Sequence, residues 1–409
     1  STTTRRQAGT NGEPLDRDTY LLRIYDDLIL AAIKVRASDI HFSFSRDEFS
    51  SQCLIALRMH GRFRPWRRDI HTKLVQGMLG ASFGKRLVTH TNSKAQLTFD
   101  SPVAYMTRNI GPDGVIWTGR CNGRKTRGYR MVIRLLENTP AAERVPTLEE
   151  LGYVPSHQQI LETAVKRNFG VIVIFGSTGS GKSTTLRTFM VRVTDPTEQA
   201  VYSVENPVEY EMPGVEQISL PVDVEATSDE IASKFVAALR DIMRMDPDVL
   251  MVGEIRDKET GKLVSEFSQT GHRCYTTCHG DGAVDGIQRM CGSEIGMPAE
   301  LFAGSKFLSA AIYQRLLPRL CSHCRIPATD PKAGLSQAQQ RLLREKFRLD
   351  PGTMYVANEA GCAHCAPNIP GLAANGTKGV IVAPEVLVPT ADMREQAGGA
   401  VGVDDAGQP

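Results

Sequence analysis

A glycine-rich segment at 176–183, G-S-T-G-S-G-K-S, follows directly on an apolar run at 171–175, V-I-V-I-F. The run is typical of a buried parallel strand, and a strand that ends in such a turn before a helix presents backbone N–H groups to an anion. The glycines let the backbone wrap around a phosphate without a Cβ clash, and Lys182 reaches the β- and γ-phosphates as a point charge. We therefore predict an ATP site formed by nine consecutive residues: Gly176, Ser177, Thr178, Gly179, Ser180, Gly181, Lys182, Ser183 and Thr184.

In this site the Ser183 hydroxyl is placed to bind Mg²⁺. The alternative is a strand-to-helix turn that is rich in glycine by coincidence. The strand, the loop, the lysine and the hydroxyl stand in the order that phosphate binding needs, which favours the nucleotide site.

A second apolar run, Val249–Val252, lies within D-P-D-V-L-M-V-G-E-I-R-D at 246–257 and leads to Glu254. A strand at this place delivers the glutamate to the carboxyl edge of a sheet, where the phosphates would also lie. A carboxylate beside the γ-phosphate orients and polarises the attacking water, and such positioning supplies much of the rate of phosphoryl transfer. We predict that Glu254 is the catalytic base.

Four of the nine cysteines form two C-x-x-C pairs, at 321–324 and 362–365, separated by 37 residues. Four thiolates at this spacing make a closed tetrahedral Zn²⁺ site, which contributes folding energy rather than catalysis. Redox use of the pairs is the alternative, and a matched pair of pairs argues against it. A further set at 272–279 could bind metal in principle, although strand packing explains it better. The predicted zinc ligands are Cys321, Cys324, Cys362 and Cys365, with His323 and His364 outside the ligand set.

The composition places the chain in a reducing compartment. The 48 basic and 46 acidic residues nearly cancel, and the net charge of +2 gives no global attraction to nucleic acid or anionic membrane. No stretch approaches the 18 apolar residues of a membrane-spanning helix, and the polar start lacks a secretory signal. An odd number of cysteines with C-x-x-C pairs favours metal over disulfides. We expect a cytoplasmic protein with no direct membrane insertion.

A chain of 409 residues is expected to form two or three domains. Helical spacing at 18–35 and alternating segments at 40–44 and 54–59 predict a mixed α/β first domain. A helix at 158–166 leads into the nucleotide strand, and further strands at 201–204, 249–252 and 274–277 alternate with helices such as 231–243, which predicts a parallel sheet covered on both faces. The expected parts are a disordered lead (1–14), the first domain (15–139), a proline-punctuated linker (140–157), the nucleotide domain (158–320), a cysteine subdomain (321–390) and a disordered tail (391–409).

Several segments resemble one family, the secretion ATPases of type II secretion, type IV pili and type IV secretion. The run at 239–257 is similar to the Walker B region of that family, T-G-H-R-C-Y-T-T-C-H-G-D-G-A at 270–283 to its histidine box, and V-E-N-P-V-E-Y at 204–210 to its aspartate box. A-S-D-I-H at 37–41 and R-M-H-G-R at 58–62 look like the opening of its N-terminal domain. The resemblance implies an α/β fold, in which a PAS-like N-terminal α+β domain precedes a RecA-like parallel-sheet P-loop ATPase domain with a tetracysteine zinc subdomain.

The resemblance also implies roles for further residues. In the aspartate box Asn206 replaces the usual second acid, so the box depends on Glu205 and Glu209. His279 and His272 would sense the state of the γ-phosphate, and a core histidine that donates to a backbone carbonyl is the alternative for each.

Arg120 and Arg134 are similar to the paired arginines that reach the nucleotide of a neighbouring subunit in this family. A permanently charged guanidinium neutralises charge that develops on the γ-phosphoryl group. The alternative is a basic solvated face of a β-ribbon.

A homo-hexameric motor is the function that the resemblance implies. It would hydrolyse ATP between subunits and act on an inner-membrane platform protein of a pilus, secretion or conjugation machine, and head-to-tail contacts would close the ring. The cysteine pairs and the run Y-Q-R-L-L-P-R-L at 313–320 resemble the zinc subdomain of the assembly-type members. The pilus-retraction members generally lack this subdomain. One alternative is a RecA-like nucleic-acid translocase, although no long interleaving of basic and aromatic residues supports a nucleic-acid partner. Another is a nucleotide-gated assembly protein with little turnover, because Asn206 departs from the family pattern.

Overall fold

The computed structural model describes residues 17–45, 52–83, 87–90, 96–99, 103–110, 115–126, 128–138, 145–205, 208, 212–220, 228–367 and 369–394. The chain divides into two compact units, one of residues 1–137 with 318–380 and one of residues 138–317 with 381–409. The unit that contains the N-terminus thus also contains the cysteine pairs. Within these described ranges, no helix has the length and apolar character that crossing a bilayer requires.

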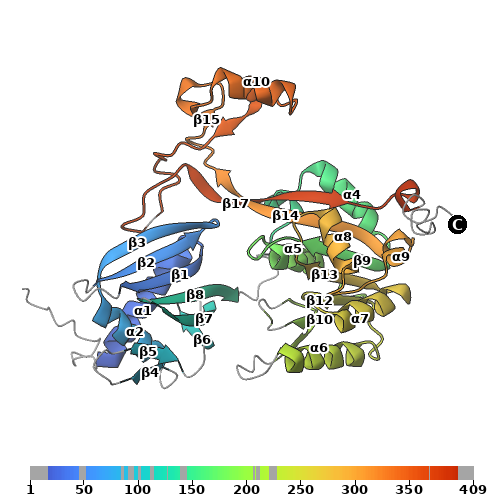
Figure 1. Ribbon diagram of the computed structural model, residues 1–409, viewed down its shortest axis with the longest axis horizontal. Helices are drawn as coiled ribbons and strands as arrows, with labels where there is room; N and C mark the ends of the chain where they lie inside the picture. The colour runs from blue at the N-terminus through green and yellow to red at the C-terminus, as the bar shows by residue number, and fades with distance from the viewer. Residues whose placement is uncertain are drawn as a thin grey trace, which may run out of the picture. The chain divides into compact units, whose positions relative to one another are not determined.

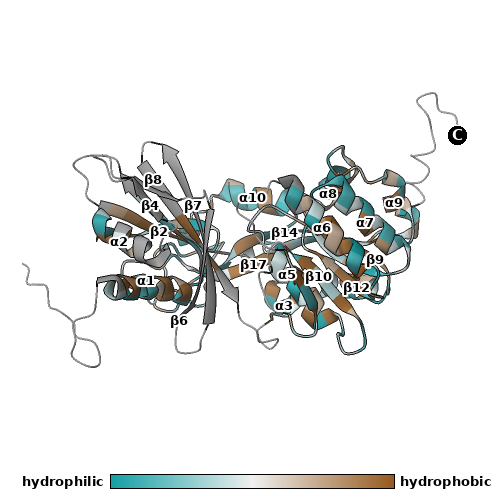
Figure 2. Cartoon of the chain, turned by 90° about the horizontal axis from the view of Figure 1, so that it is seen from below, coloured by the Kyte–Doolittle hydropathy of each residue, from teal (hydrophilic) through white to brown (hydrophobic). Residues whose placement is uncertain are grey.

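The first unit contains a six-stranded sheet in the order β3-β2-β1-β8-β7-β6 (Figure 1). Helix α1 (Arg17–Lys34) packs on it through Tyr25 and Ile29, which are buried, and its brown hydrophobic residues alternate with teal polar ones in Figure 2. The helix and two strands that the sequence predicted at 18–35, 40–44 and 54–59 are confirmed. The remaining elements are β1 (Ala37–Ser45), β2 (Gln52–Met59), β3 (Arg62–His71), α2 (Thr72–Phe83), β6 (Val103–Ile110), β7 (Val115–Thr126) and β8 (Gly128–Asn138), with a separate hairpin of β4 (Leu87–His90) and β5 (Gln96–Phe99).

The cysteine region of the same unit holds little regular structure. A short ladder joins β15 (Ile326–Pro327) to β16 (Tyr355–Val356), and α10 (Gln337–Glu345) begins at Ser336 with a capping box that includes Gln339. Past the second cysteine pair, Ile369 is buried in the core of the N-terminal sheet. Trp66 Nε1 on β3 donates a hydrogen bond to the carbonyl oxygen of Pro370 at 2.9 Å. The cysteine region therefore docks on the N-terminal sheet through the segment that follows Cys365.

The second unit is built on a seven-stranded sheet in the order β11-β10-β12-β13-β9-β14-β17 (Figure 1). The pairings from β11 to β14 are parallel. Predicted strands at 201–204, 249–252 and 274–277 are confirmed as β10 (Val201–Glu205), β12 (Val249–Val252) and β13 (Arg273–Cys278), beside β9 (Gly170–Phe175). The other strands are β11 (Glu216–Ser219), β14 (Leu308–Leu320) and β17 (Thr377–Leu387). Strands β14 and β17 lead into and out of the cysteine region, and the Cys321 N–H donates to the Gly376 carbonyl at 2.8 Å.

Helices cover both faces of this sheet, as the alternation of strands and helices predicted. On β9, Val171, Val173 and Phe175 belong to one hydrophobic core, and Ile172 and Ile174 belong to the other. The first core is covered by α6 (Ser228–Ile242), α7 (Lys258–Gln269), α8 (Ala283–Cys291) and α9 (Ala299–Ala303). The second is covered by α3 (Leu148–Leu151), α4 (Pro155–Val165), α5 (Lys182–Thr188) and the π-helical turn Phe189–Val193. Helix α4 starts before the predicted residue 158 because Pro155 fits the first helical position.

Candidate nucleotide site and cysteine cluster

The glycine-rich loop leaves β9 and runs into α5. Gly176, Gly179 and Gly181 all have positive φ, at 150°, 78° and 87°, a backbone region that side chains disfavour. A Cβ on Gly176 would stand 2.7 Å from the carbonyl oxygen of Gln314 on β14, so this position admits no side chain. Ser177, Thr178, Gly179 and Ser183 are exposed, and Gly181, Lys182 and Thr184 are half-buried. The loop therefore forms an open backbone cradle of the kind that binds phosphate.

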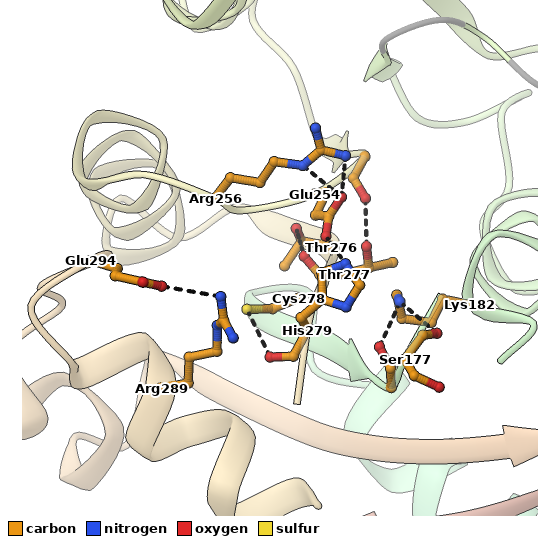
Figure 3. A network of polar contacts seen from close by, with 12 residues as sticks. Ser177, Lys182, Glu254, Arg256, Thr276, Thr277, Cys278, His279, Arg289 and Glu294 are labelled. Carbon is orange, nitrogen blue, oxygen red and sulfur yellow. Dashed lines mark hydrogen bonds and ion pairs between the residues drawn. The ribbon is translucent and has the colours of Figure 1, made fainter. Parts of the chain in front are cut away.

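Lys182 folds back over this loop. Its Nζ donates to the carbonyl oxygens of Gly176 at 2.7 Å and Ser177 at 3.2 Å (Figure 3). Burial lowers the pKa of the Lys182 ammonium, and the charge of Glu254 opposes that shift. Lys182 follows β9 and Glu254 follows β12, so both groups lie at the carboxyl edge of the sheet, where the sequence analysis expected them.

Glu254 follows β12 and is the centre of a polar network (Figure 3). Its Oε2 accepts a hydrogen bond from Arg256 Nε at 2.7 Å and a second from Nη2. Its Oε1 lies 3.1 Å from His279 Nε2, within ion-pair distance. This Oε1 is buried and has no aligned hydrogen-bond donor among the described residues. No directed hydrogen bond therefore occupies this oxygen, and a base for hydrolysis needs such an unused acceptor once water enters the site.

The backbone around Glu254 is tied to β13. Thr277 Oγ1 donates to the Gly253 carbonyl at 2.7 Å, and the Ile255 N–H donates to the Thr277 carbonyl at 2.9 Å. His279 follows the same strand, so the ends of β12 and β13 bring the glutamate and this histidine together. Burial raises the pKa of Cys278, the residue before His279, to about 11, so that group remains a thiol.

The aspartate box is described only in part. Glu205 ends β10, which pairs with β12, and its Oε1 accepts from Ser203 Oγ at 2.9 Å and from Gln217 Nε2 at 3.0 Å. These contacts hold the carboxylate at the same edge of the sheet as Glu254. Asn206 and Glu209 lie outside the described residues.

His272 lies at the opposite end of β13 from His279. Its carbonyl oxygen accepts from the N–H of Gly170, the first residue of β9, whereas the glycine-rich loop follows the last residue of that strand. The imidazole stacks on Phe267 with ring centroids 4.9 Å apart, and its Nδ1 is 2.9 Å from Thr270 Oγ1. The structure therefore does not bring His272 to the loop of its own chain.

Arg120 lies on β7 and Arg134 on β8, neighbouring strands of the first unit. Arg134 is paired in register with Asp39 of β1, and Arg120 with Tyr105 of β6. Both arginines belong to a different unit from the glycine-rich loop. A role at a nucleotide would therefore depend on another unit or another subunit.

The four predicted zinc ligands converge. The Sγ atoms of Cys321 and Cys362 are 3.8 Å apart, as are those of Cys324 and Cys365, and all four lie within 4.8 Å of one another. Tetrahedral Zn²⁺ with bonds of about 2.3 Å places its sulfurs roughly 3.8 Å apart, so the cluster fits this metal. It is the one candidate metal cluster among the described residues, so the set at 272–279 forms none.

Three residues at the nucleotide site were missed in the sequence. Arg256 falls within the segment that carries Glu254, but nothing in its spacing shows that it folds back on the carboxylate. Gln314 reaches the glycine-rich loop from a distant part of the chain, and Tyr153 in turn bonds to Gln314. A lone amide in the mostly apolar, buried start of β14, L-S-A-A-I-Y-Q, was the available signal for Gln314.

A family model described as "Type II/IV secretion system protein" matches residues 123–401. The chain belongs to this family. It is similar to the type II secretion system protein HxcR of Pseudomonas aeruginosa, with 31% identity over 312 residues that cover 75% of this chain and 60% of HxcR. It is also similar to the type IV pilus assembly ATPase PilB of Thermus thermophilus, with 32% identity over 334 residues that cover 80% of this chain and 34% of PilB. The chain thus spans less than two thirds of the length of each of these relatives. The resemblance to secretion ATPases inferred from the sequence is confirmed.

The fold is similar to that of the Legionella pneumophila ATPase DotB, with a TM-score of 0.59 and 18% identity over 92% of this chain and 83% of DotB. At this identity the likeness concerns the fold alone.

Proposed function

We propose that this chain is an ATP-hydrolysing motor of a type II secretion, type IV pilus or related conjugation machine. The observation that carries the proposal is the meeting of the glycine-rich loop, Lys182 and the Glu254–His279 pair at one edge of a parallel sheet. The names of two relatives support it, one a secretion system protein and the other a pilus assembly ATPase. We also propose that the six-stranded sheet belongs to a PAS-like domain and the seven-stranded sheet to a RecA-like domain.

The residues of the site suit the reaction. The loop N–H groups and Lys182 would bind the phosphates. To do so, the Lys182 ammonium would exchange its hydrogen bonds to the carbonyl oxygens of Gly176 and Ser177 for contacts with phosphate. Glu254 Oε1 would hold and polarise the attacking water, with His279 beside it and Arg256 fixing the other carboxylate oxygen. Mg²⁺, when bound at Ser183, would neutralise charge on the phosphates. Glu205, at the end of β10, and Glu209 would support the metal.

We further propose that the site is completed between subunits of a homo-hexamer, by Arg120 and Arg134 of a neighbour. Both arginines lie in the unit that lacks the loop, which is what a shared site requires. His272, away from the loop of its own chain, has no part in this scheme unless it faces a neighbour. The four cysteines would hold a structural Zn²⁺.

Mixing two inactive variants tests the shared site. Glu254→Gln spoils the pocket and leaves the arginines, and the double substitution Arg120→Ala with Arg134→Ala does the reverse. In randomly mixed rings about one quarter of the interfaces would pair an intact pocket with intact arginines, so about one quarter of the normal turnover should return. Mixing Glu254→Gln with Lys182→Ala is the matched control, because both changes spoil the pocket, and it should restore nothing.

Loss of turnover in both variants with no recovery on mixing would contradict a site shared between subunits. Normal ATP turnover in the arginine variant would contradict the arginine role as well. A mass of six subunits with a non-hydrolysable nucleotide is expected for the ring.

The partner would be an inner-membrane platform protein, which the motor meets from the cytoplasm. A nucleic-acid translocase is distinguished by adding single-stranded DNA to the ATPase assay. Strong stimulation that falls with salt would favour the translocase and contradict the secretion motor. Absence of turnover with Mg²⁺ and ATP would favour the nucleotide-gated assembly protein.

A further inference from the structure

The side chain of Gln314 lies directly beneath the glycine-rich loop. We propose that Gln314, oriented by the Tyr153 hydroxyl, is a positioning residue that holds the peptide between Ser180 and Gly181 in its phosphate-binding orientation. The inference rests on the proposed role of the loop as a nucleotide site. It gives a function to a residue from the run at 313–320 that the proposed reaction does not use.

The hydrogen bonds fix the orientation of the Gln314 amide. Its Nε2 donates to the carbonyl oxygen of Ser180 at 2.8 Å, and its Oε1 accepts from the Tyr153 hydroxyl at 3.0 Å. A carbonyl oxygen can only accept, so the amide nitrogen must face Ser180 and the amide oxygen must face Tyr153. Gln314 is 0% exposed and Tyr153 is 1% exposed, so water does not compete for either bond.

The geometry of the peptide group carries this orientation to the ligand side of the loop. In a trans peptide the C=O and the following N–H point in opposite directions. Because Gln314 holds the Ser180 carbonyl toward β14, the Gly181 N–H points away from β14, toward the open side of the loop. Gly181 has φ +87°, where a peptide flip meets little steric resistance, so an external anchor has an effect there.

The loop also fits closely around this one residue at two other points. A Cβ on Gly181 would stand 3.1 Å from Gln314 Nε2, and a Cβ on Gly176 would stand 2.7 Å from the Gln314 carbonyl oxygen. The Gln314 side chain therefore limits Gly181, and the Gln314 backbone limits Gly176. Displacement of the side chain would loosen the loop at Gly181.

Tyr153 is itself held by the segment between α3 and α4. Its N–H donates to the Leu148 carbonyl at 2.9 Å, and its carbonyl accepts from Gln158 Nε2 at 2.6 Å. Gly152, with φ +114°, makes the turn that places it. The Tyr153 hydroxyl also lies close to Thr185 of α5, beyond the loop residues, so its effect on the Ser180–Gly181 peptide should pass through Gln314, and this order can be tested.

The test is ADP affinity, measured by calorimetry with Mg²⁺ on the full chain. Gln314→Met keeps the volume and removes both hydrogen bonds, and it should weaken ADP binding about tenfold while kcat at saturating ATP stays within about twofold. Tyr153→Phe leaves the bond to Ser180 and should weaken binding about threefold. The double variant should bind ADP no more weakly than Gln314→Met alone, because Tyr153 acts through Gln314.

Stability separates positioning from general damage. Gln314→Met leaves a buried hydroxyl without a partner, so the double variant should melt at a higher temperature than Gln314→Met while its affinity stays low. Ile312→Val, buried on the same strand, is the control that costs stability without touching the loop, and it should bind ADP within about twofold of the unmodified chain.

Unchanged ADP affinity in Gln314→Met would overturn the proposal, and so would additive losses in the double variant. If Gln314→Met fails to fold, Tyr153→Phe decides, and normal affinity there refutes the role of the tyrosine anchor. An unmodified chain that binds no ADP would instead refute the nucleotide site itself.

Discussion

Removal of metal from the cysteine cluster should be detected at Trp66, on the N-terminal sheet. The segment after Cys365 docks on that sheet through buried Ile369 and the hydrogen bond from Trp66 Nε1 to Pro370. Burial of Ile369 stabilises the docked segment by about 2 kcal/mol, and the hydrogen bond adds about 1 kcal/mol. Ordering the backbone of the five residues 369–373 costs about 5–10 kcal/mol. Leu372, partly buried against the same core, and the hydrogen bond from Arg64 to the Ala373 carbonyl add about 2 kcal/mol, so all the docking contacts together reach only the lower end of this cost.

The metal makes up the difference, because a structural Zn²⁺ site supplies about 10 kcal/mol or more and holds the start of the segment in place. We therefore expect the metal-free chain to release the segment from β3. The indole N–H of half-buried Trp66 would then exchange its carbonyl partner for water.

Fluorescence measures this release. The chain has two tryptophans, so Trp117→Phe leaves Trp66 as the single reporter. Displacement of the metal by a reagent that binds the cysteine thiols reversibly should shift the Trp66 emission to longer wavelength. Removal of the reagent and addition of Zn²⁺ should restore the emission. Trp66→Phe, which keeps Trp117, is the matched control and should show little change. A chain that has released its metal, with four reactive thiols and unshifted Trp66 emission, would refute the coupling.

Three further predictions concern the nucleotide site. Glu254→Gln should lower kcat at least about 100-fold and move Tm by only a few degrees, because its partner Arg256 is 73% exposed and the lost ion pair is worth little; a calorimetric Tm beside a phosphate-release assay checks both, and retained turnover would contradict the base assignment. Gly176→Ala should abolish ADP binding in a chain that stays folded by circular dichroism, since its Cβ would collide with the Gln314 carbonyl; normal affinity would contradict the strain argument. A lysine carries charge only below its pKa, and burial lowers that pKa for Lys182. As the pH is raised, ADP affinity should therefore begin to fall at a lower pH than it would with an ordinary lysine. An affinity that stays constant up to the ordinary lysine pKa would contradict this prediction.

Local patterns were enough to predict most of the second unit. The apolar runs at 171–175 and 249–252 became β9 and β12 at the predicted places, because a buried parallel strand leaves a continuous apolar signal. The glycine-rich loop and Glu254 follow these strands directly, so their positions were fixed once the strands were. The two cysteine pairs carry a spacing with few other uses, and their sulfur atoms converge as expected.

Side-chain contacts were beyond the sequence. Arg256 pairs with Glu254, two residues before it in an irregular segment that no periodicity marks. Gln314 and Tyr153 are 161 residues apart, and their hydrogen bond depends on how the linker folds against β14. His272 shares a segment with His279, but a six-residue strand separates them by the full height of the sheet. The docking of residues 369–373 on β3 is of the same long-range kind.

The hydrogen bond from the Cys321 N–H to the Gly376 carbonyl has a consequence for how this chain can vary. The two ends of the segment 322–375 lie close together, because the segment connects the end of β14 to the start of the adjacent strand β17. They form a cassette that can be lengthened, shortened or exchanged for a tight turn without shifting the register of the strands that carry the loop and Glu254. The same parallel sheet can in this way carry different attachments.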